Sequence, residues 1–436
     1  EFEDGTNTYD GLVVMAPWIG DYIALAGVED LTSRITPQLR WSDVLRVVRE
    51  SICTYDEKTY MIPVDMDSML VVYREDLRSA SGLPVPDTWE RVIQMAKAFH
   101  GKDLNGDGVP DYGLCVPLVA NEFGTWHFLT VVTSYMQTLG TEEGAFFDKA
   151  TMRSLFRTEA FKEAVKTYVE ALRYGPAPYD NATHGPFQAW NGSWGSFWHL
   201  RPRAHGDKVW TDANYLDVQL PSMVQGRCAI AFDWTTTATA QMSEGAFGTS
   251  QVHNKLRATN VGTDKVRDKE TGRLRSCDME SCPFASIDVE NASSLVNFAP
   301  FLAGGGIGAT LNSKAHEEAK ALTFDFYSYI SVTSEDFLSQ QGGWVQPFRR
   351  SHFREELWET SGLDAPSYRN YANTIREACE HPNAVLDIRL PGFSEYYSAL
   401  DRRRLAFLER IDLEDPVMLS EAIDRFSEDV ADDYDQ

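Results

Sequence analysis

The chain has 436 residues, of which 43% are apolar and 12% aromatic, a composition typical of a globular protein with more than one domain. Its 65 acidic and 40 basic residues give a net charge of −25, which argues against nucleic acids and anionic membrane surfaces as partners. No apolar run reaches the ~18 residues that a transmembrane helix needs, so the sequence predicts no membrane span.

Strands and helices alternate along the first half of the sequence. Short runs of β-branched and aromatic residues between turn residues predict strands, and apolar residues at helical spacing predict helices. Thr88 precedes an amphipathic stretch and is the expected N-cap of its helix. In chain order we expect a strand at 12–16, a helix from 19, strands at 59–65 and 68–76, a helix at 88–101, a strand at 112–119, and helices at 123–140 and 159–175.

The second half continues this pattern with one interruption. Residues 223–237 predict a turn, a buried strand and the start of a helix, whereas 243–285 are polar and irregular. A strand, a glycine loop and a second strand are expected over 297–313, followed by a helix at 316–331 and further helices to the C-terminus. The alternation predicts an α/β architecture with parallel sheets.

The stretch DLNGDGVPDYG is rich in oxygen ligands. Asp103, Asn105, Asp107 and Asp111 stand where a calcium loop of the EF-hand type has its first, third, fifth and ninth ligands, but Leu114 replaces the closing glutamate. A calcium switch is not expected, because a strand follows in place of a second helix. Two interpretations stay open: a structural Ca²⁺ site formed by these four residues, or a turn without metal, since Asp, Asn and Gly favour turns by themselves.

The chain has six cysteines, none at the spacing of a zinc site. Cys277 and Cys282 lie close together in a polar loop, and we expect them to form a disulfide in an oxidising compartment. Cys228 lies in an apolar strand and is expected to be buried. The pairing of four cysteines stays open: Cys53, Cys115, Cys228 and Cys379.

Several segments, taken in order, match one pattern. The most specific is YMIPVDMDSMLVVYREDLRSASGLPVPDTWERVIQMAKAF, which has an apolar-Pro-x-Asp strand, a Tyr-Arg-Glu-Asp-Leu turn and a Pro-x-Thr-Trp helix start. YDGLVVMAPWIGDYIALAGVEDLTSRI, MVQGRCAIAFDW, GGGIGATLNSKAHEEAKALTFDFYSYI and RLPGFSEYYSAL fit the same pattern. Together they resemble family 1 of the extracellular solute-binding proteins, the maltose-binding-protein-like sugar-binding components of ABC importers.

The resemblance implies a two-lobed periplasmic-binding-protein fold of type II. Each lobe would be a mostly parallel sheet flanked by helices, with the ligand cleft between the lobes. The first lobe would comprise residues 1–64 and 304–342, and the second lobe residues 66–300 and 345–436. The family's first strand, helix and second strand have no counterpart in the sequence, so we expect the first lobe to expose apolar surface unless another segment fills that place.

Carboxylates and aromatic rings follow several of the predicted strands, where α/β sheets bind ligands. Sugars offer hydroxyl edges and flat C–H faces, which carboxylates, amides and aromatic rings bind. For each tryptophan the alternative is a role in core packing, and Trp126, on an aromatic helix face, is expected in the core. The ligand-binding candidates are Trp18, Asp21, Asp65, Asp67, Glu122, Asp233, Trp234, Trp344 and Tyr396.

We therefore expect an extracellular or periplasmic protein, secreted or membrane-tethered, that captures a small polar solute, with a carbohydrate favoured, for an ABC importer. It would work as a monomer with a membrane permease and without a required cofactor. The alternative is a ligand-sensing ectodomain of the same fold, fused to a receptor kinase or cyclase. A glycoside-processing enzyme is disfavoured, because the sequence contains no GxSxG, HExxH, P-loop or GxGxxG motif.

Overall fold

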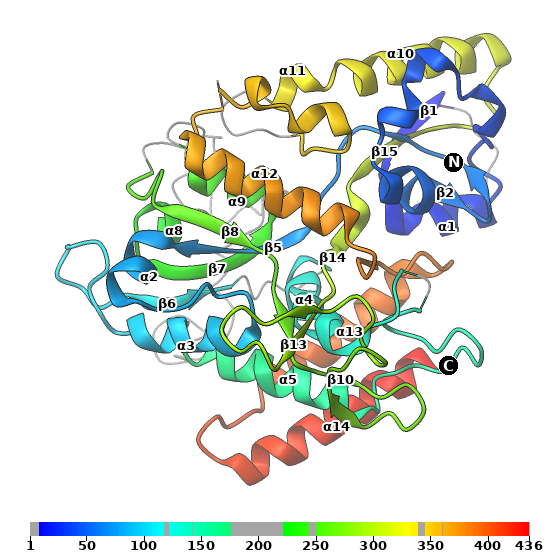
Figure 1. Ribbon diagram of the computed structural model, residues 1–436. Helices are drawn as coiled ribbons and strands as arrows, with labels where there is room; N and C mark the ends of the chain where they lie inside the picture. Colours follow the sequence, from blue (N-terminus) through cyan, green and yellow to red (C-terminus); the bar gives the residue numbers. More distant parts are fainter. Residues whose placement is uncertain are drawn as a thin grey trace, which may run out of the picture.

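The computed structural model describes residues 8–116, 122–141, 143–175, 221–243, 250–338, 345–359 and 361–435. Its strands and helices confirm the predicted α/β class. Figure 1 shows two main sheets set apart from one another, one in the upper right part of the molecule and one on the left. No helix within these described ranges is long and apolar enough to cross a membrane.

The smaller main sheet brings together strands from distant parts of the sequence. Its centre is β15 (Ile307–Leu311), which pairs with β1 (Gly11–Met15) on one side and with β4 (Ile62–Pro63) on the other. Helix α1 (Ile19–Ala24) follows β1, and α10 (Glu317–Thr333) packs against β15 and β4. The chain therefore returns to this sheet after almost 250 intervening residues.

The larger main sheet has the strand order β6-β7-β5-β8. Its two central strands are β7 (Cys228–Trp234) and β5 (Met69–Arg74), flanked by β6 (Tyr112–Cys115) and β8 (Leu256–Thr259). Every residue of β5 and β7 is buried. Their nearly continuous apolar sequences fit this placement, because a central strand covered on both faces needs no polar alternation.

Helices cover both faces of the larger sheet. Helix α3 (Trp89–Phe99) packs against β6 and β7, while α9 (Thr235–Met242) and α12 (Ala365–Glu380) lie on the opposite side in Figure 1. The hydroxyl of Thr88 accepts a hydrogen bond from the backbone N–H of Arg91 at 3.3 Å, which confirms the predicted N-cap of α3.

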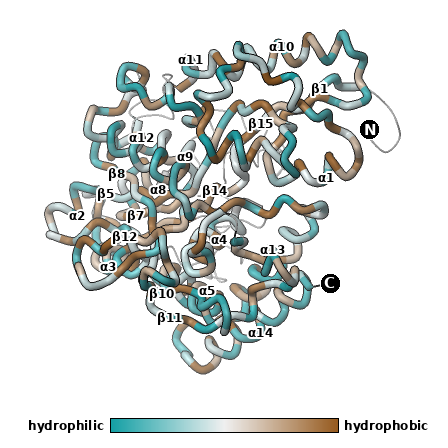
Figure 2. The backbone as a smooth tube through the Cα atoms, turned by 45° about the vertical axis from the view of Figure 1, so that its right-hand side comes forward, coloured by the Kyte–Doolittle hydropathy of each residue, from teal (hydrophilic) through white to brown (hydrophobic). Residues whose placement is uncertain are grey.

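The other elements extend the molecule around these two sheets. Four helices, α4, α5, α13 and α14, pack against one another in the lower part of Figure 1, and the outermost of them, α14, is largely hydrophilic in Figure 2. The further α-helices are α2 (Glu75–Ser81), α4 (Glu122–Met136), α5 (Glu159–Leu172), α8 (Pro221–Val224), α11 (Glu335–Leu338), α13 (Phe393–Leu408) and α14 (Pro416–Tyr434). The further strands are β2 (Thr54–Tyr55), β3 (Lys58–Thr59), β9 (Gly262–Thr263), β10 (Lys265–Arg267), β11 (Leu274–Ser276), β12 (Ser286–Ile287), β13 (Leu295–Phe298), β14 (Phe301–Leu302) and β16 (Val385–Leu386).

The prediction of mostly parallel sheets is wrong for the described strand pairs. Only β6–β7 in the main sheets is parallel, whereas β15 is antiparallel to both of its neighbours and β5 is antiparallel to β7 and β8. Alternating strands and helices give parallel pairs when each helix returns the chain to the same end of the sheet. Here the pairing strands enter from opposite ends after long excursions, which a local pattern does not reveal.

The interval 243–285, predicted to be a loop-rich excursion, is in part regular. It contains β8, which completes the larger sheet by pairing with β5, and the short strands β9, β10 and β11. These strands are only two to four residues long. The partners of β8 and β9, which are β5 and β13, lie further away in the sequence, whereas β10 and β11 pair with each other. Their local sequence therefore carries little strand pattern.

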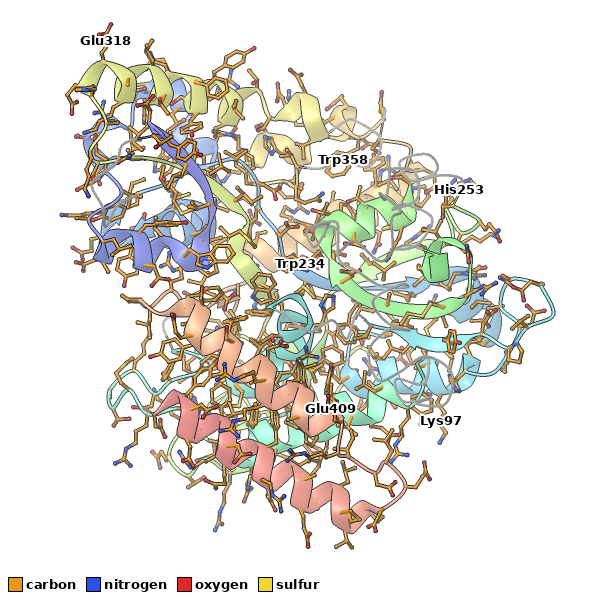
Figure 3. The ribbon with its side chains drawn as sticks, turned by 180° about the vertical axis from the view of Figure 1, so that it is seen from behind. Lys97, Trp234, His253, Glu318, Trp358 and Glu409 are labelled. Atoms are coloured by element: carbon orange, nitrogen blue, oxygen red, sulfur yellow. A yellow bond between two sulfur atoms is a disulfide. The ribbon has the colours of Figure 1, made fainter. Side chains whose placement is uncertain are left out.

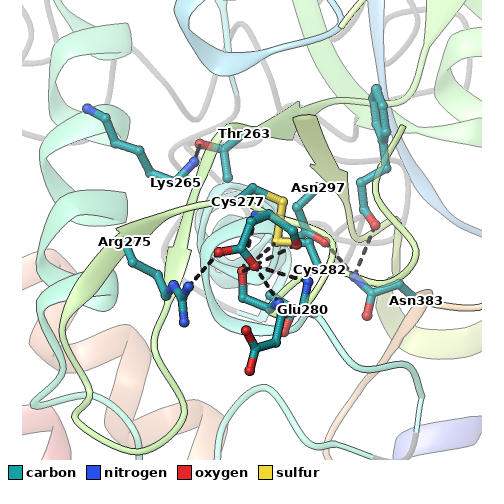
Figure 4. Close-up of a disulfide and its surroundings, with 12 residues drawn as sticks. Thr263, Lys265, Arg275, Cys277, Glu280, Cys282, Asn297 and Asn383 are labelled. Carbon is teal, nitrogen blue, oxygen red and sulfur yellow. Dashed lines mark hydrogen bonds and ion pairs between the residues drawn. A yellow bond between two sulfur atoms is a disulfide. The ribbon is translucent and has the colours of Figure 1, made fainter. Parts of the chain in front are cut away.

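Two disulfides tie the structure together. The predicted bond between Cys277 and Cys282 is confirmed, and Figure 4 shows it within a polar loop beside Arg275. The second disulfide joins Cys115 of β6 to Cys228 of β7, whose Cα atoms are 6.0 Å apart, and Cys228 is buried as predicted. The sequence left the partner of Cys228 open. The disulfide joins two neighbouring strands whose cysteines are 113 residues apart in the sequence. Two cysteines are free and buried: Cys53 and Cys379.

Apolar side chains are exposed on the smaller sheet and on α10. Val13 on β1 is 56% exposed. On α10, the exposed residues Leu322, Phe326 and Tyr329 follow one another at helical spacing, so they share one face of the helix.

Two chain segments that join the smaller sheet to the rest of the fold touch each other. Residues 64–68 lead from β4 to β5, and the loop Gly304–Gly306 leads from β14 into β15. We call this loop the glycine crossing. Its three residues have φ values of +66°, +63° and +76°, a conformation that glycine adopts without strain. A Cβ atom on Gly306 would lie only 2.4 Å from the carbonyl oxygen of Asp65, so the two segments are in backbone contact.

Candidate functional site

Two buried carboxylates lie on the segment that connects the sheets. Asp65 accepts the backbone N–H of Gln346 at 2.5 Å, and Asp67 accepts the hydroxyls of Thr235 and Thr236 at 2.6 and 3.0 Å. Burial and the charge of Asp67 raise the pKa of Asp65 well above its ordinary value, and burial raises the pKa of Asp67. The pair therefore holds a proton more readily than exposed carboxylates do, and a protonated carboxyl donates as well as accepts a hydrogen bond.

A buried hydroxyl network stands beside these carboxylates. The hydroxyl oxygen of Tyr371, on α12, lies 2.5 Å from Oε1 of Gln346 and 2.5 Å from the hydroxyl of Thr239. It also lies 2.6 Å from the carbonyl oxygen of Thr235 at the start of α9. The network links α9 and α12 of the larger sheet to the residue whose backbone holds Asp65.

Trp234, the last residue of β7, lies near the centre of the molecule in Figure 3. Its ring meets the ring of Trp126, on α4, edge to face, with centroids 5.1 Å apart and planes at 90°. Cη2 of Trp234 lies 3.4 Å from the place where a Cβ on Gly304 would stand. The two indoles therefore pack directly against the glycine crossing. Trp126 is fully buried, as expected from its position on the helix.

A third aromatic residue and a carboxylate complete this group. Asp387, which follows β16, accepts a hydrogen bond from Nε1 of Trp126 at 2.6 Å and another from the hydroxyl of Tyr397 at 2.5 Å. The ring of Tyr397 lies 5.7 Å from that of Trp126. Burial raises the pKa of Asp387 to about 6, although its hydrogen-bond donors favour the ionised form. We call Trp234, Trp126 and Tyr397 the ring cluster.

Trp18 and Asp21 lie together at the start of α1, but they face the beginning of α13. Nε1 of Trp18 donates to the hydroxyl of Ser394 at 3.1 Å, and its ring meets that of Phe393 edge to face at 5.6 Å. Asp21 accepts the backbone N–H of Gly392 at 2.5 Å. Both side chains are half-buried. These contacts join the helix of the smaller sheet to the helical layer below the larger sheet.

Tyr396 turns away from the ring cluster. It packs against Phe147 and Tyr434, with ring centroids 5.6 and 5.1 Å apart, whereas its neighbour Tyr397 joins the cluster. Adjacent residues on a helix point about 100° apart, so only one of the two tyrosines can face Trp126.

The remaining candidates have separate positions. Asp233 is buried, and its Oδ1 lies 3.3 Å from Nε2 of His127 on α4. Glu122 is the first residue of α4. Trp344 lies outside the residues that the structure describes.

The acidic loop uses its oxygens on its own backbone. Asp103 accepts the N–H groups of Gly106 and Gly108 at 2.6 and 2.9 Å, and Asp111 accepts the N–H of Leu104 at 2.7 Å. The side-chain oxygens of Asn105 and Asp107 likewise accept the N–H groups two residues further along. Across the described residues, no group of three or more His, Cys, Asp or Glu side chains is placed to hold a metal ion. The contacts favour the turn interpretation, and the Ca²⁺ alternative gains no support.

Sequence reasoning missed two residues that the structure brings to this region. Asp387 has no local pattern that marks it, because its partners Trp126 and Gly304 come from distant segments and Tyr397 lies ten residues away on α13. Tyr397 could have been found from the helical spacing of α13, in which Phe393 and Tyr397 share one buried face.

The family described as bacterial extracellular solute-binding protein matches residues 3–252, more than half of the chain. No curated protein matches the sequence significantly. Among solved structures, an ABC transporter solute-binding protein from Agrobacterium radiobacter K84, in complex with ribitol, is similar with a TM-score of 0.65 and 17% identity. That match covers 99% of this chain and 86% of the other.

Two further structures support the same fold. Maltose-bound MalE3 of T. maritima is similar with a TM-score of 0.63 and 16% identity, over 98% of this chain and 85% of that one. A solute-binding protein from Agrobacterium vitis S4 with bound D-mannitol gives a TM-score of 0.59 and 15% identity, over 98% and 85% of the two chains. At these identities the likeness concerns the fold, whereas the family rests on the sequence match: the chain is a member of the bacterial extracellular solute-binding proteins.

Proposed function

We propose that this protein captures a carbohydrate or a polyol between two lobes and delivers it to the permease of an ABC importer. Its family binds solutes outside the cell, and structures of similar fold are named with ribitol, maltose and D-mannitol as their bound solutes. The ring cluster and the Asp65–Asp67 pair are the chemistry that such solutes need, because flat rings cover C–H faces and carboxyls bind hydroxyl groups.

The observation that carries the proposal is the place where these groups meet. Trp234 and Trp126 pack against the glycine crossing, and Asp65 lies in backbone contact with Gly306 of the same crossing. A solute held at this point would touch both of these segments. Two lobes close around a solute by a hinge motion, and the hinge residues lie in such connecting segments.

We infer a first lobe of residues 1–64 and 304–342 and a second lobe of 66–300 and 345–436. One set of contacts refines the third connection between them. The carbonyl oxygen of Phe348 accepts the N–H of Leu45 at 2.9 Å. The guanidinium of Arg349 donates to the carbonyl oxygen of Leu39 at 3.1 Å. We therefore draw the third crossing C-terminal to Arg349, which moves residues 345–349 from the second lobe to the first.

We also infer that the protein binds its solute without converting it and needs no cofactor, because its family is one of binding proteins. Membership of an importer is the simplest use of that binding, and it requires a permease partner. A receptor ectodomain would use the same capture step, and no contact in the described residues favours it.

Isothermal titration with maltose, ribitol and D-mannitol tests the proposal. We expect saturable one-site binding of at least one of the three, with maltose recovered intact after prolonged incubation. At a solute concentration 100 times its Kd, binding should stabilise the fold by about 2.7 kcal/mol. Absence of binding to all three, or conversion of maltose to glucose, would contradict the proposal.

A further inference from the structure

The carboxylate of Asp387 is surrounded by hydrogen-bond donors from three separate parts of the fold. Oδ2 accepts Nε1–H of Trp126 at 2.6 Å and the backbone N–H of Gly304 at 3.2 Å. Oδ1 accepts the hydroxyl of Tyr397 at 2.5 Å and the backbone N–H of Ile388 at 2.8 Å. The side chain is 8% exposed. One buried carboxylate thus contacts α4, α13 and the glycine crossing at once.

We propose that Asp387 is a positioning residue whose ionised carboxylate fixes the ring cluster against the glycine crossing, so that protonation of Asp387 loosens that arrangement. The inference rests on the proposed function insofar as the ring cluster binds a solute. Asp387 itself acts through Trp126 and Tyr397, and Trp126 in turn carries Trp234 by their edge-to-face contact.

The arrangement requires a group that only accepts hydrogen bonds. An ionised carboxylate offers acceptor sites on both oxygens, which matches donors on both sides of Asp387. A protonated carboxyl carries a hydrogen on one oxygen. If that oxygen is Oδ2, it opposes the N–H groups of Trp126 and Gly304, and if it is Oδ1, the hydroxyl of Tyr397 must change from donor to acceptor. Either outcome removes or reverses at least one hydrogen bond that orients a ring.

The protonation of Asp387 is not coupled to an ion pair with a basic side chain in the described residues. On α13, Asp387 faces Tyr397. On α14, the charge of Asp387 adds to the effect of burial in raising the pKa of Tyr434. From its own segment, Arg389 donates instead to the carbonyl oxygens of Ile52 and Thr54. No Lys, Arg or His in the described part of the chain forms an ion pair with Asp387, so no cation holds the carboxylate ionised at low pH.

Burial increases the proton affinity of the Asp387 carboxylate. It raises the pKa of Asp387 to about 6, against the four donors, which lower it. The carboxylate is therefore ionised above about pH 6 and protonated below it. A solute-binding protein with this device would hold its rings most firmly at neutral and alkaline pH.

Nuclear magnetic resonance of the indole N–H groups tests this inference without any solute. In protein labelled with ¹⁵N at the tryptophan indoles, the peak that disappears in Trp126→Phe identifies Trp126. We expect this peak to shift with a single midpoint near pH 6 as the pH is lowered from about 8 to about 4. The peak of Trp89, whose Nε1–H donates to the hydroxyl of Ser134 at 2.9 Å, serves as the internal control and should not follow that midpoint.

Two variants separate positioning from general packing. Asp387→Asn should abolish the titration of the Trp126 peak, and Tyr397→Phe should move its midpoint to higher pH, because it removes a donor that lowers the pKa. A Trp126 peak that does not titrate in the folded wild type would overturn the inference, as would a midpoint that Tyr397→Phe lowers or leaves unchanged. Since no solute is present, failure of the proposed carbohydrate function would leave this titration unaffected, and the two outcomes stay distinguishable.

Discussion

Gly306 combines two constraints that exclude every other residue. Its φ of +76° belongs to the left-handed region, and a Cβ atom would lie 2.4 Å from the carbonyl oxygen of Asp65 and 2.6 Å from Cα of Met66. Both neighbours are backbone atoms, so they can move only if the whole connection between the sheets moves. The glycine thus allows the two connecting segments to touch.

We expect Gly306→Ala to lower the free energy of unfolding by about 2–5 kcal/mol, the combined cost of left-handed strain and overpacking. Gly82→Ala is the matched control, because Gly82 also has a positive φ, +66°, but nothing within 4 Å of its Cβ position. It should cost only about 1–2 kcal/mol. Chemical denaturation of both variants gives the comparison, and equal losses would contradict the crossing contact.

Asp387 also predicts a dependence of stability on pH. Its pKa is about 6 in the folded protein and close to 3.8 in an unfolded chain, so the folded state binds the proton more tightly. The resulting stabilisation is complete below about pH 4 and is lost as the pH rises through about 6, by roughly 3 kcal/mol in total. Asp387→Asn lacks this loss, since an amide does not ionise.

The melting temperature of Asp387→Asn, taken relative to wild type, should therefore rise between about pH 4 and about pH 7. Calorimetric scans of both proteins across that range measure the difference directly. Because the comparison is between two proteins at each pH, the titration of all other groups cancels. A difference that stays constant with pH would show that Asp387 does not change its protonation there.

Single residues were predictable where position after a strand marks them. Asp65, Asp67 and Trp234 follow or end buried strands, and the structure brings all three to the connections between the sheets. The sequence predicted Tyr396 as a ligand-binding residue, but it is the neighbouring Tyr397 that joins the ring cluster. The sequence alone does not show which face of α13 points toward Trp126. Asp387 could not be predicted, since its role depends on Trp126 and Gly304, which lie far away in the sequence.

At the scale of elements, local pattern was sufficient for long amphipathic helices. Helix α3 begins after the predicted cap Thr88 and buries its apolar stripe, and α10 occupies almost the predicted range. The strand β8 was missed and the strand directions were wrong, because β8 and β15 form only through partners more than 180 residues away. Strand pairing over such distances depends on the folded chain, so a short stretch of sequence contains little information about it.

The acidic loop provides a prediction at the same scale. Its oxygens are already bound to backbone N–H groups, so we expect EDTA to leave the melting temperature unchanged and added Ca²⁺ to leave it unchanged as well. Differential scanning fluorimetry in metal-free buffer makes the measurement. A melting temperature that falls in EDTA and recovers with Ca²⁺ would restore the calcium-site interpretation.

At the scale of the whole molecule, the ordered series of motifs predicted the family and the two-lobed class, which the family match and the solved structures support. The motifs lie on both main sheets and on the connections between them, so their order reflects how the chain passes from one sheet to the other. The choice of solute is different in kind. In our proposal it depends on a few side chains from α4, β7 and α13, which the fold brings together at the glycine crossing.

The central claim is that the ring cluster at the glycine crossing recognises the solute. Trp234 is only 6% exposed, but burial alone does not separate packing from recognition, because a solute enclosed between lobes also meets buried side chains. Trp89 is the matched control: it is fully buried on α3 and contacts Phe232 of β7, away from the crossing.

The decisive measurement is the calorimetric affinity of Trp234→Ala and Trp89→Ala for the carbohydrate that wild type binds, at a temperature where circular dichroism shows all three folded. We predict a loss of about 2 kcal/mol, roughly 30-fold in Kd, for Trp234→Ala and no change for Trp89→Ala, although both should melt at lower temperature. Unchanged affinity in Trp234→Ala, with a fall in melting temperature like that of Trp89→Ala, would mean that Trp234 is a core residue and that the solute binds elsewhere.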